Sequence, residues 1–235
     1  AVPVAEIGLG MALSLARGIH TAHADFVAGR EAYGLESNTK AEILTGSNIG
    51  FVGFGDLGRA LHHLLSSFRA NVRVFDPWLP DDYLRRQGVI PVTFDEVLST
   101  SRVLFVAASV TSDNTHLFDA PALARMQTGA MLILLSRAAL ADFDAMAAEA
   151  ASGRLRFATD VFPEEPVAPD DPIRRVPGIL FSAHRAGALT SALRAIGDHV
   201  LEDLSLIERG LPPVTCRRAE RETVGRLRSK PIKAS

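Results

Sequence analysis

The sequence predicts an α/β fold built on one parallel β-sheet with helices on both faces. Two observations lead to this prediction. Short, almost continuously apolar segments such as 103–107 and 131–135 alternate with longer segments whose apolar residues recur every three or four positions. Parallel strands are buried on both faces and therefore have uninterrupted apolar sequences. The chain of 235 residues is also long enough for one large domain of this class with additional segments.

Two long amphipathic helices are predicted near the ends of the chain. Apolar residues recur every three or four positions throughout 4–26, which is the spacing of one face of a single long helix. Residues 30–48 are polar and rich in turn-forming residues, so they predict a connection. The same helical spacing returns at 192–207.

The segments between these helices alternate strand and helix. Residues 49–52 form a short apolar strand, 59–65 continue as a helix and 72–75 form the next strand, which completes a βαβ unit. Further along, Asp142 is placed to cap a helix that ends at Gly153. The other predicted elements are a short piece at 89–92, helices at 94–98 and 120–126, and strands at 103–107, 131–135, 157–159 and 179–181.

A glycine-rich loop joins the strand at 49–52 to its helix. Its sequence, Gly53-Phe54-Gly55-Asp56-Leu57-Gly58, has the glycine spacing of a dinucleotide-binding loop. Gly53 permits the tight turn, Gly55 lets the backbone approach a pyrophosphate, and Gly58 lets the helix pack close to the strand. Asp56 and Leu57, between these glycines, are also predicted to lie at the cofactor, since the N–H groups and dipole of the following helix attract phosphates. The fold class is therefore predicted to be Rossmann-type, with a long N-terminal helix and a C-terminal helix plus tail.

An acidic residue, Asp76, follows the strand at 72–75. It lies about 20 residues beyond the loop, as the dinucleotide-binding pattern requires. Its carboxylate can accept hydrogen bonds from the adenosine ribose hydroxyls and would repel a 2′-phosphate. NAD is therefore the predicted cofactor, in preference to NADP.

Composition argues against several other classes of protein. Hydrophobic residues make up 47% and charged residues 22% of the chain, with net charge −2 and pI near 6.4, so no nucleic-acid partner is expected. No apolar run approaches the roughly 20 residues that span a bilayer, and the single cysteine, Cys216, cannot form an internal disulfide. With no signal peptide, we expect a cytoplasmic enzyme without a membrane partner. The histidines other than His184 lack metal-ligand spacing, so no metal is expected.

Two longer motifs lie downstream of the loop. They are Asp160-Val161-Phe162-Pro163-Glu164-Glu165-Pro166 and Ser182-Ala183-His184-Arg185-Ala186-Gly187. Both motifs are preceded, in this order, by the glycine loop, Asp76, Ser136-Arg137 and Gly153. In this order the chain resembles the D-isomer-specific 2-hydroxyacid dehydrogenase family, which includes phosphoglycerate, glycerate and formate dehydrogenases. The resemblance extends from residue 1 to about residue 213.

The resemblance implies an oxidoreductase that transfers a hydride between NAD(H) and C2 of a 2-hydroxy or 2-oxo acid, acting on the CH–OH group. It places the substrate anchor at Arg137, whose guanidinium can bind the substrate carboxylate and 2-oxygen through paired hydrogen bonds. It places the acid–base group at His184, because an imidazole titrates near neutrality, with Glu165 as the partner that orients it. Ser136, Asp160 and Gly187 are implied to contact the cofactor, Asp160 at the nicotinamide amide.

Two segments depart from the family pattern. The asparagine usually found three residues before the arginine is Leu134 here, and the glycine that usually follows the arginine is Ala138. The proline-leucine-threonine segment after the middle strand is replaced by residues 109–115, with an extra residue. We therefore expect altered backbone geometry near Arg137 and altered contacts to the nicotinamide ribose.

The resemblance also implies a domain organisation. Residues 1–40 correspond to an interdomain and dimerisation helix with its connection, 41–190 to the NAD-binding domain, and 191–235 to the C-terminal helix and basic tail of a substrate domain. Most of that substrate domain, which in the family precedes the first helix, is not in this sequence. We therefore expect the chain by itself to bind NAD, to turn over poorly and to form a homodimer.

Two other hypotheses stay open from the sequence. The chain could be a non-catalytic NAD-binding regulatory module, similar to the C-terminal-binding corepressors. It could also be a dinucleotide-binding subunit that takes its substrate half from another chain. Retention of Arg137, Glu165 and His184 favours the enzyme but does not exclude the regulatory module, because function resides in the site and not in the fold.

Overall fold

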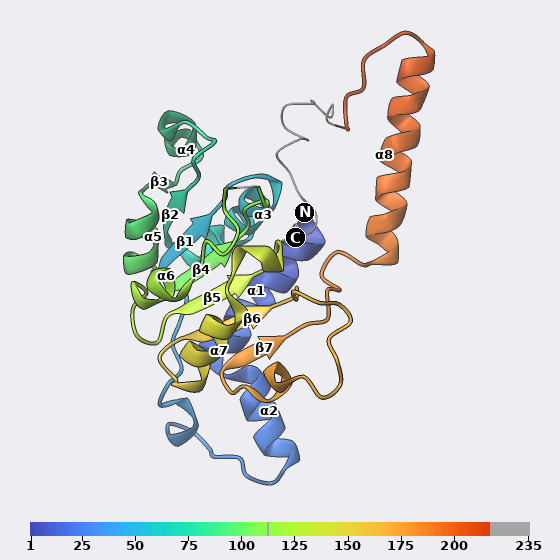
Figure 1. Cartoon of the computed structure of the whole chain (residues 1–235). Coiled ribbons are helices and arrows are strands. Elements are labelled where there is room, and N and C mark those ends of the chain that lie inside the picture. Colours follow the sequence, from blue (N-terminus) through green and yellow to red (C-terminus); the bar gives the residue numbers. More distant parts are fainter. Residues whose placement is uncertain (112, 217–235) are drawn as a thin grey trace, which may run out of the picture.

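The centre of the molecule is one parallel β-sheet (Figure 1), seen in a computed structural model that describes residues 1–111 and 113–216. Within this part of the chain the strand order is β3-β2-β1-β4-β5-β6-β7, and all neighbouring strands are parallel. The order reverses between β1 and β4, which is the switch point of a Rossmann-type sheet. The strands are β1 (Asn48–Val52), β2 (Asn71–Phe75), β3 (Ile90–Pro91), β4 (Val103–Val106), β5 (Met131–Leu134), β6 (Arg156–Thr159) and β7 (Ile179–Phe181).

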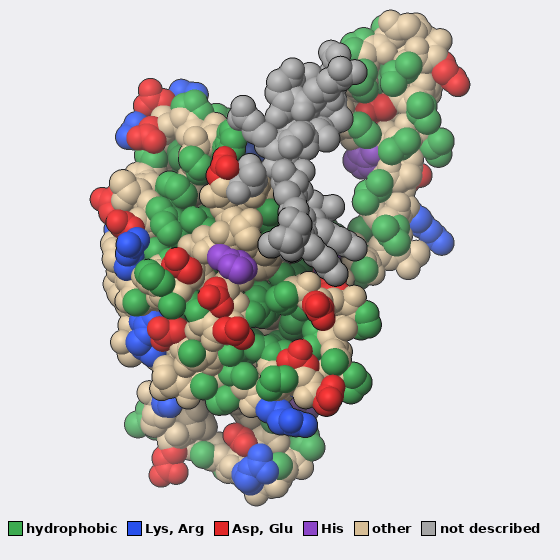
Figure 2. Space-filling model, viewed as in Figure 1, with side chains coloured by type: hydrophobic (Ala, Val, Ile, Leu, Met, Phe, Trp, Pro, Cys, Tyr) green, Lys and Arg blue, Asp and Glu red, His purple; other side chains and the backbone are tan. Residues whose placement is uncertain are grey.

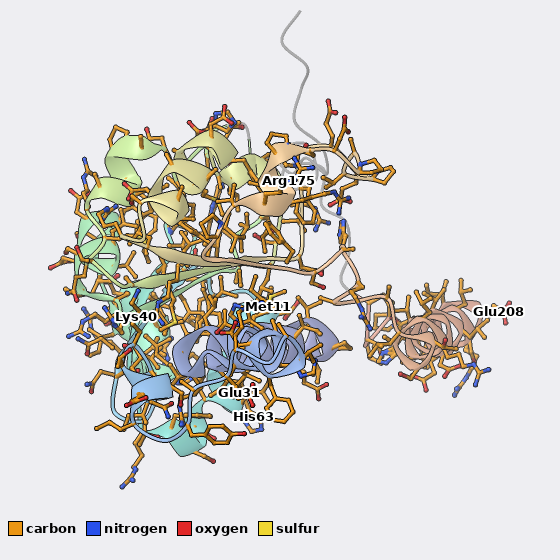
Figure 3. All side chains as sticks on the ribbon, turned by 90° about the horizontal axis from the view of Figure 1, so that it is seen from below. Met11, Glu31, Lys40, His63, Arg175 and Glu208 are labelled. Carbon is orange, nitrogen blue, oxygen red and sulfur yellow. The ribbon has the colours of Figure 1, made fainter. Side chains whose placement is uncertain are left out.

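Helices cover both faces of this sheet. One layer contains α1 (Val2–Arg17) and α3 (Asp56–Leu64), and the other contains α5 (Phe94–Thr100), α6 (Ala120–Ala124) and α7 (Phe143–Ala151). Figure 3 shows the sheet edge-on between the two layers, with Met11 of α1 lying between its helix and the strands. The remaining helical segments are α2 (Ile19–Val27), α4 (Asp81–Arg86), α8 (Thr190–Glu208), η1 (Glu36–Asn38), η2 (Ser66–Phe68), η3 (Ala138–Leu140) and η4 (Pro172–Arg175).

The central strands are buried on both faces. Phe51 of β1 and Phe105 of β4 pack into the layer of α1 and α3, where their rings stack with centroids 5.3 Å apart. Their neighbours Val52 and Leu104 point into the opposite layer. Burial of each such side chain contributes about 1.5–3 kcal/mol. This two-sided burial explains the continuous apolar sequences and confirms the predicted parallel sheet.

The prediction of one long helix over 4–26 is wrong. The helix breaks at Gly18, whose φ of 62° is left-handed, and α1 and α2 meet at a bend of 65°. Glycine reaches this conformation without steric cost, so the chain turns there even though the apolar spacing continues. Among the described residues no single helix is long and apolar enough to cross a membrane; α1 and α2 together pass that test only as this bent pair.

The predicted strands agree with the structure to within one residue at each end. Helix α4 was not predicted. Only Leu84 of this short polar helix is buried, so the sequence has no apolar repeat there, and Arg85 pairs with Asp81 and Asp82 along its surface. The capping of α7 by Asp142 is confirmed, since its side chain accepts hydrogen bonds from the Asp144 and Ala145 N–H groups.

The second long helix, α8, is confirmed and stands away from the sheet (Figure 1). Its Asp203 is 4% exposed, and the carboxylate accepts hydrogen bonds from the Val214, Thr215 and Cys216 N–H groups. These bonds fold the following segment back onto the helix. The basic tail predicted for 216–235 lies outside the described residues apart from Cys216.

Candidate active site

The glycine loop connects the end of β1 to the start of α3. Gly53 has a φ of 87°, and a Cβ there would lie 2.5 Å from the Ala108 Cα. A Cβ at Gly58 would lie 2.8 Å from the Gly53 carbonyl oxygen. At Gly55, by contrast, an added Cβ would meet no atom of the residues that the structure describes within 4 Å. The fold therefore requires glycine at positions 53 and 58, whereas glycine at 55 keeps open space beside the first turn of α3.

The other predicted residues of the loop lie in that first turn. Asp56 is exposed and forms an ion pair with Arg59, while Leu57 packs partly against the core of the α1 and α3 layer. The N–H groups that begin a helix have no partners within the helix, and the helix dipole makes this end electropositive. Both features suit a pyrophosphate.

Asp76 is held against the same loop. Its Oδ2 accepts a hydrogen bond of 2.8 Å from the Phe54 N–H, and its Oδ1 accepts one of 2.9 Å from the Trp78 N–H. The carboxylate at the end of β2 is thereby fixed beside the loop at the end of β1, although 22 residues separate Asp76 from Phe54. An open space at Gly55, a helix N-terminus and a fixed carboxylate together fit the pyrophosphate and adenosine ribose of NAD.

Arg137 and Ser136 follow β5 at the same edge of the sheet, because all strands are parallel. Arg137 is exposed, and one of its guanidinium nitrogens donates a 2.7 Å hydrogen bond to the Ser136 carbonyl. The Ser136 hydroxyl is buried and has no hydrogen-bond partner among residues 1–111 and 113–216. The two nearby residues that differ from the family pattern belong to the core. Leu134 is fully buried in β5, and Ala138 packs in the core where η3 begins.

Glu165 and His184 form the predicted hydrogen-bonded pair. His184 Nδ1 lies 2.6 Å from Glu165 Oε2. A carboxylate can only accept, so Nδ1 carries the proton and Nε2 is the nitrogen left for a substrate. The other carboxylate oxygen of Glu165 accepts a 2.9 Å hydrogen bond from the Phe162 N–H. The carboxylate is therefore fixed from two sides, and it fixes the imidazole in turn.

Electrostatics link this pair to Arg137. Partial burial alone raises the pKa of Glu165, but the hydrogen bonds from His184 and the Phe162 N–H lower it, and the charges of His184 and Arg137 lower it further. The net result is a pKa below the ordinary value of 4.5. Glu165 is therefore a carboxylate at neutral pH. The three groups that the resemblance selected thus act on one another in space.

Asp160 lies beneath the turn that carries His184. It is 2% exposed, and its carboxylate oxygens accept hydrogen bonds from the Arg185 and Ala186 N–H groups. Gly187 is exposed on the same turn, and an added Cβ would lie 3.6 Å from a Val4 methyl group of α1. The contacts of Asp160 and Gly187 with a nicotinamide stay predictions.

A cavity of about 640 Å³ borders the Glu165–His184 pair. Phe181 of β7 and the residues that follow this strand form one side of the cavity. Apolar side chains form most of its wall, while the His184 imidazole at its border is still 49% exposed to solvent. Its lining residues are Phe162, Glu165, Pro166, Val167, Ile173, Arg174, Phe181, Ser182, Ala183 and His184.

Sequence reasoning missed Arg174 as part of this region. Its guanidinium donates hydrogen bonds of 2.7 Å to the carbonyl groups of both Ala168 and Val167. These bonds brace the loop that carries Glu165. No side-chain motif indicates such a contact, because its acceptors are backbone atoms.

The comparisons with known proteins agree with this geometry. Residues 9–186 match the family model described as the D-isomer specific 2-hydroxyacid dehydrogenase, NAD binding domain. The chain belongs to this family, and its cofactor is NAD.

Relatives of this family cover most of the chain. D-lactate dehydrogenase from Escherichia coli (strain K12) is 30% identical over 222 residues, which is 88% of this chain and 66% of that enzyme. A phosphoglycerate oxidoreductase from Rhizobium etli is 54% identical, with a TM-score of 0.89 over 94% of this chain and 67% of that one. NAD-dependent formate dehydrogenase from Staphylococcus aureus, solved with NAD, is 28% identical, with a TM-score of 0.79 over 90% of this chain and 63% of that one. The chain thus spans 66% of the length of the curated lactate dehydrogenase.

Proposed function

We propose that this chain is the NAD-binding half of a dehydrogenase that interconverts a 2-hydroxy acid and a 2-oxo acid. The observation that carries the proposal is the 2.6 Å hydrogen bond between Glu165 and His184, with the charge of Arg137 acting on Glu165, at the sheet edge that carries the glycine loop. A dinucleotide loop alone is compatible with many functions. An oriented imidazole with a nearby guanidinium specifies proton transfer to and from a bound acid.

The residues that would hold the cofactor are those of the loop from Gly53 to Gly58, together with Asp76. NAD when bound supplies the hydride acceptor for C2 of the hydroxy acid, and NADH supplies the hydride in the reverse direction. Asp76 would accept hydrogen bonds from the adenosine ribose, and its charge would oppose a 2′-phosphate. This favours NAD(H) over NADP(H).

His184 would exchange the proton. In oxidation, its Nε2 accepts the proton of the substrate hydroxyl as the C2 oxygen becomes a carbonyl, and the imidazolium then releases this proton to water. In reduction the same nitrogen donates a proton to the forming hydroxyl. The negative charge of Glu165 stabilises the imidazolium in both directions. Because Glu165 occupies Nδ1, the proton can only be exchanged at Nε2.

Arg137 would bind the substrate carboxylate. Its guanidinium offers five N–H donors in a planar fork, of which one is used by the Ser136 carbonyl. The remaining donors can form a paired interaction with a carboxylate and the 2-oxygen. This would hold C2 within reach of His184. Small 2-hydroxy and 2-oxo acids are the proposed substrates, as the names of the relatives suggest: D-lactate dehydrogenase, glyoxylate reductase and hydroxypyruvate reductase.

We further propose that other substrate contacts come from a domain that this chain does not span, and that α8 packs against it. The support lies in the exposed apolar side chains of α8, which include Leu193, Ile196 and Leu201; the helix carries green patches in Figure 2. A homodimer is also proposed, because Phe26 and Val27 of α2 are exposed. Light scattering of the chain in solution checks the dimer, and a monomer at all concentrations contradicts it.

The test of the enzymatic function uses the full-length product of the gene. Its rate of NADH oxidation with a panel of 2-oxo acids is compared with that of His184→Ala, and we expect the variant to be about 10²- to 10⁴-fold slower. His63→Ala is the matched control, because His63 is exposed in the last turn of α3, at the end of this helix that is remote from the glycine loop. Figure 3 shows it in the layer of α1 and α3. Equal rates for wild type and His184→Ala contradict the assignment. NADH binding without turnover of any acid favours the regulatory module instead.

A further inference from the structure

The turn that carries His184 has an unusual backbone. His184 has a φ of 48°, which lies in the left-handed region that residues other than glycine seldom occupy. Its N–H donates a 2.7 Å hydrogen bond to the carbonyl of Asp160 at the end of β6. The turn therefore needs a specific set of contacts to keep this conformation.

The side chain of Asp160 supplies those contacts. Its Oδ1 accepts a 3.1 Å hydrogen bond from the Arg185 N–H, and its Oδ2 accepts one of 3.0 Å from the Ala186 N–H. Successive N–H groups next to a left-handed residue form a concavity that binds anions. A buried carboxylate in turn requires such donors. The Asp160 side chain, which is 2% exposed, therefore occupies the anion-binding position of this turn.

We propose that Asp160 is a positioning residue for His184: its carboxylate holds the N–H groups of Arg185 and Ala186, and the turn fixed in this way directs the imidazole toward Glu165. The backbone of His184 and its side chain are then fixed by two different carboxylates, Asp160 below and Glu165 beside it. The relevance to catalysis rests on the proposed function. The effect of Asp160 on the Glu165–His184 hydrogen bond can be measured without cofactor or turnover.

This role differs from the nicotinamide contact that the family resemblance implies for Asp160. A carboxylate has about four acceptor positions, so two backbone bonds leave capacity for a ligand. The two roles nevertheless predict different behaviour without cofactor. If Asp160 only contacts the nicotinamide, its replacement leaves the Glu165–His184 hydrogen bond unchanged in the protein without cofactor. If Asp160 positions His184, its replacement weakens this hydrogen bond.

The experiment compares Asp160→Asn with the wild-type chain in the absence of NAD. The amide is nearly isosteric but has one acceptor oxygen, so one of the two backbone bonds is lost. Proton NMR follows the low-field resonance of the His184 Nδ1–H, assigned by its disappearance in Glu165→Gln. We expect Asp160→Asn to broaden or abolish this resonance. In the full-length protein we expect kcat to fall about tenfold or more, while KM for NADH changes less.

Asp203→Asn is the matched control. Asp203 is also a buried carboxylate that accepts backbone N–H bonds, but it lies on α8. This variant should leave the His184 resonance unchanged. A folded Asp160→Asn chain with an unchanged resonance overturns the proposal, as does an effect confined to NADH affinity.

A second measurement uses the wild-type chain and so tests the proposal even if Asp160→Asn does not fold. In the wild-type chain, hydrogen exchange of the Arg185 and Ala186 amides must be slow, because Asp160 accepts from both. Exchange at the rate of free amides overturns the proposal even if no variant is studied. If the resonance and exchange results are as expected but the full-length protein turns over no 2-oxo acid, the proposed function fails and the positioning role stands.

Discussion

Replacing Gly55 by alanine should separate cofactor binding from folding. Among the described residues an added Cβ at this position meets no atom within 4 Å, and the φ of −71° is not in the left-handed region that requires glycine. Gly55 is the N-cap of α3, where alanine is less favourable than glycine, but alanine also lowers the entropy of the unfolded chain. We therefore expect the free energy of unfolding to change by less than about 1 kcal/mol.

NADH binding should respond much more strongly to the same change. The open space at Gly55 lies beside the N-terminus of α3, where this class of fold binds the pyrophosphate. A methyl group that intrudes on a close contact costs about 1–3 kcal/mol. The dissociation constant for NADH should therefore rise roughly 5- to 150-fold.

The assay is a fluorescence titration with NADH. The sequence contains a single tryptophan, and this Trp78 lies two residues beyond Asp76, so its emission should report on the adenosine side of the site. Thermal unfolding followed by circular dichroism gives the stability of the same samples. An unchanged NADH dissociation constant in a folded Gly55→Ala chain would falsify the placement of the pyrophosphate at this loop.

Gly53→Ala is the opposite control. Its φ of 87° is unfavourable for alanine, and its Cβ would lie 2.5 Å from the Ala108 Cα. Left-handed strain and steric overlap together should cost about 2–5 kcal/mol. The midpoint of thermal unfolding should fall by roughly 4–20 °C. A Gly53→Ala chain as stable as the wild type shows that the loop has another conformation in solution.

Three further predictions concern charged groups. Asp76→Ala should weaken NADH binding about tenfold and reduce the preference for NADH over NADPH, as measured by parallel titrations; tighter NADPH binding by the wild type contradicts this. The pKa of Glu165 lies below its ordinary value of 4.5, so its interaction with His184 stabilises the fold above pH 4.5 and is lost as the pH falls through the lowered pKa. The stability difference between wild type and Glu165→Gln in thermal unfolding should therefore vanish in acid, and a constant difference argues against the pair. The hydrogen bond and charge of Asp203 raise the pKa of the Cys216 thiol, so Asp203→Asn should increase its rate of reaction with a thiol reagent at mildly alkaline pH by about 2- to 10-fold, whereas equal rates contradict the contact.

The sequence predicts best those features that depend on residues adjacent along the chain. The strands at 103–106 and 131–134 follow from continuous apolar sequences, because a strand buried on both faces has no polar position. The glycine loop could be predicted as well, since each glycine answers a local steric demand. Gly18 shows the limit of periodicity. Apolar residues keep their spacing across it, yet its left-handed backbone ends α1 and redirects α2.

The sequence selected the reacting groups only through resemblance to a family. Arg137, Glu165 and His184 belong to three different loops, and charge or periodicity does not bring them together. The parallel sheet does, because the carboxyl ends of β5, β6 and β7 lie at one edge. Glu165 and His184, which are 19 residues apart, then come within 2.6 Å.

The sequence by itself determined the parallel sheet, the dinucleotide loop and the identity of the candidate reacting groups, since these depend on hydrophobic spacing, glycine sterics and recognisable motifs. Only the tertiary structure decided how those groups are held. Asp160 was assigned to the nicotinamide from its motif, whereas the fold places its carboxylate on two backbone N–H groups of the His184 turn. Backbone donors are present at nearly every residue and leave no mark in the sequence, so their partners become visible only when the chain is folded.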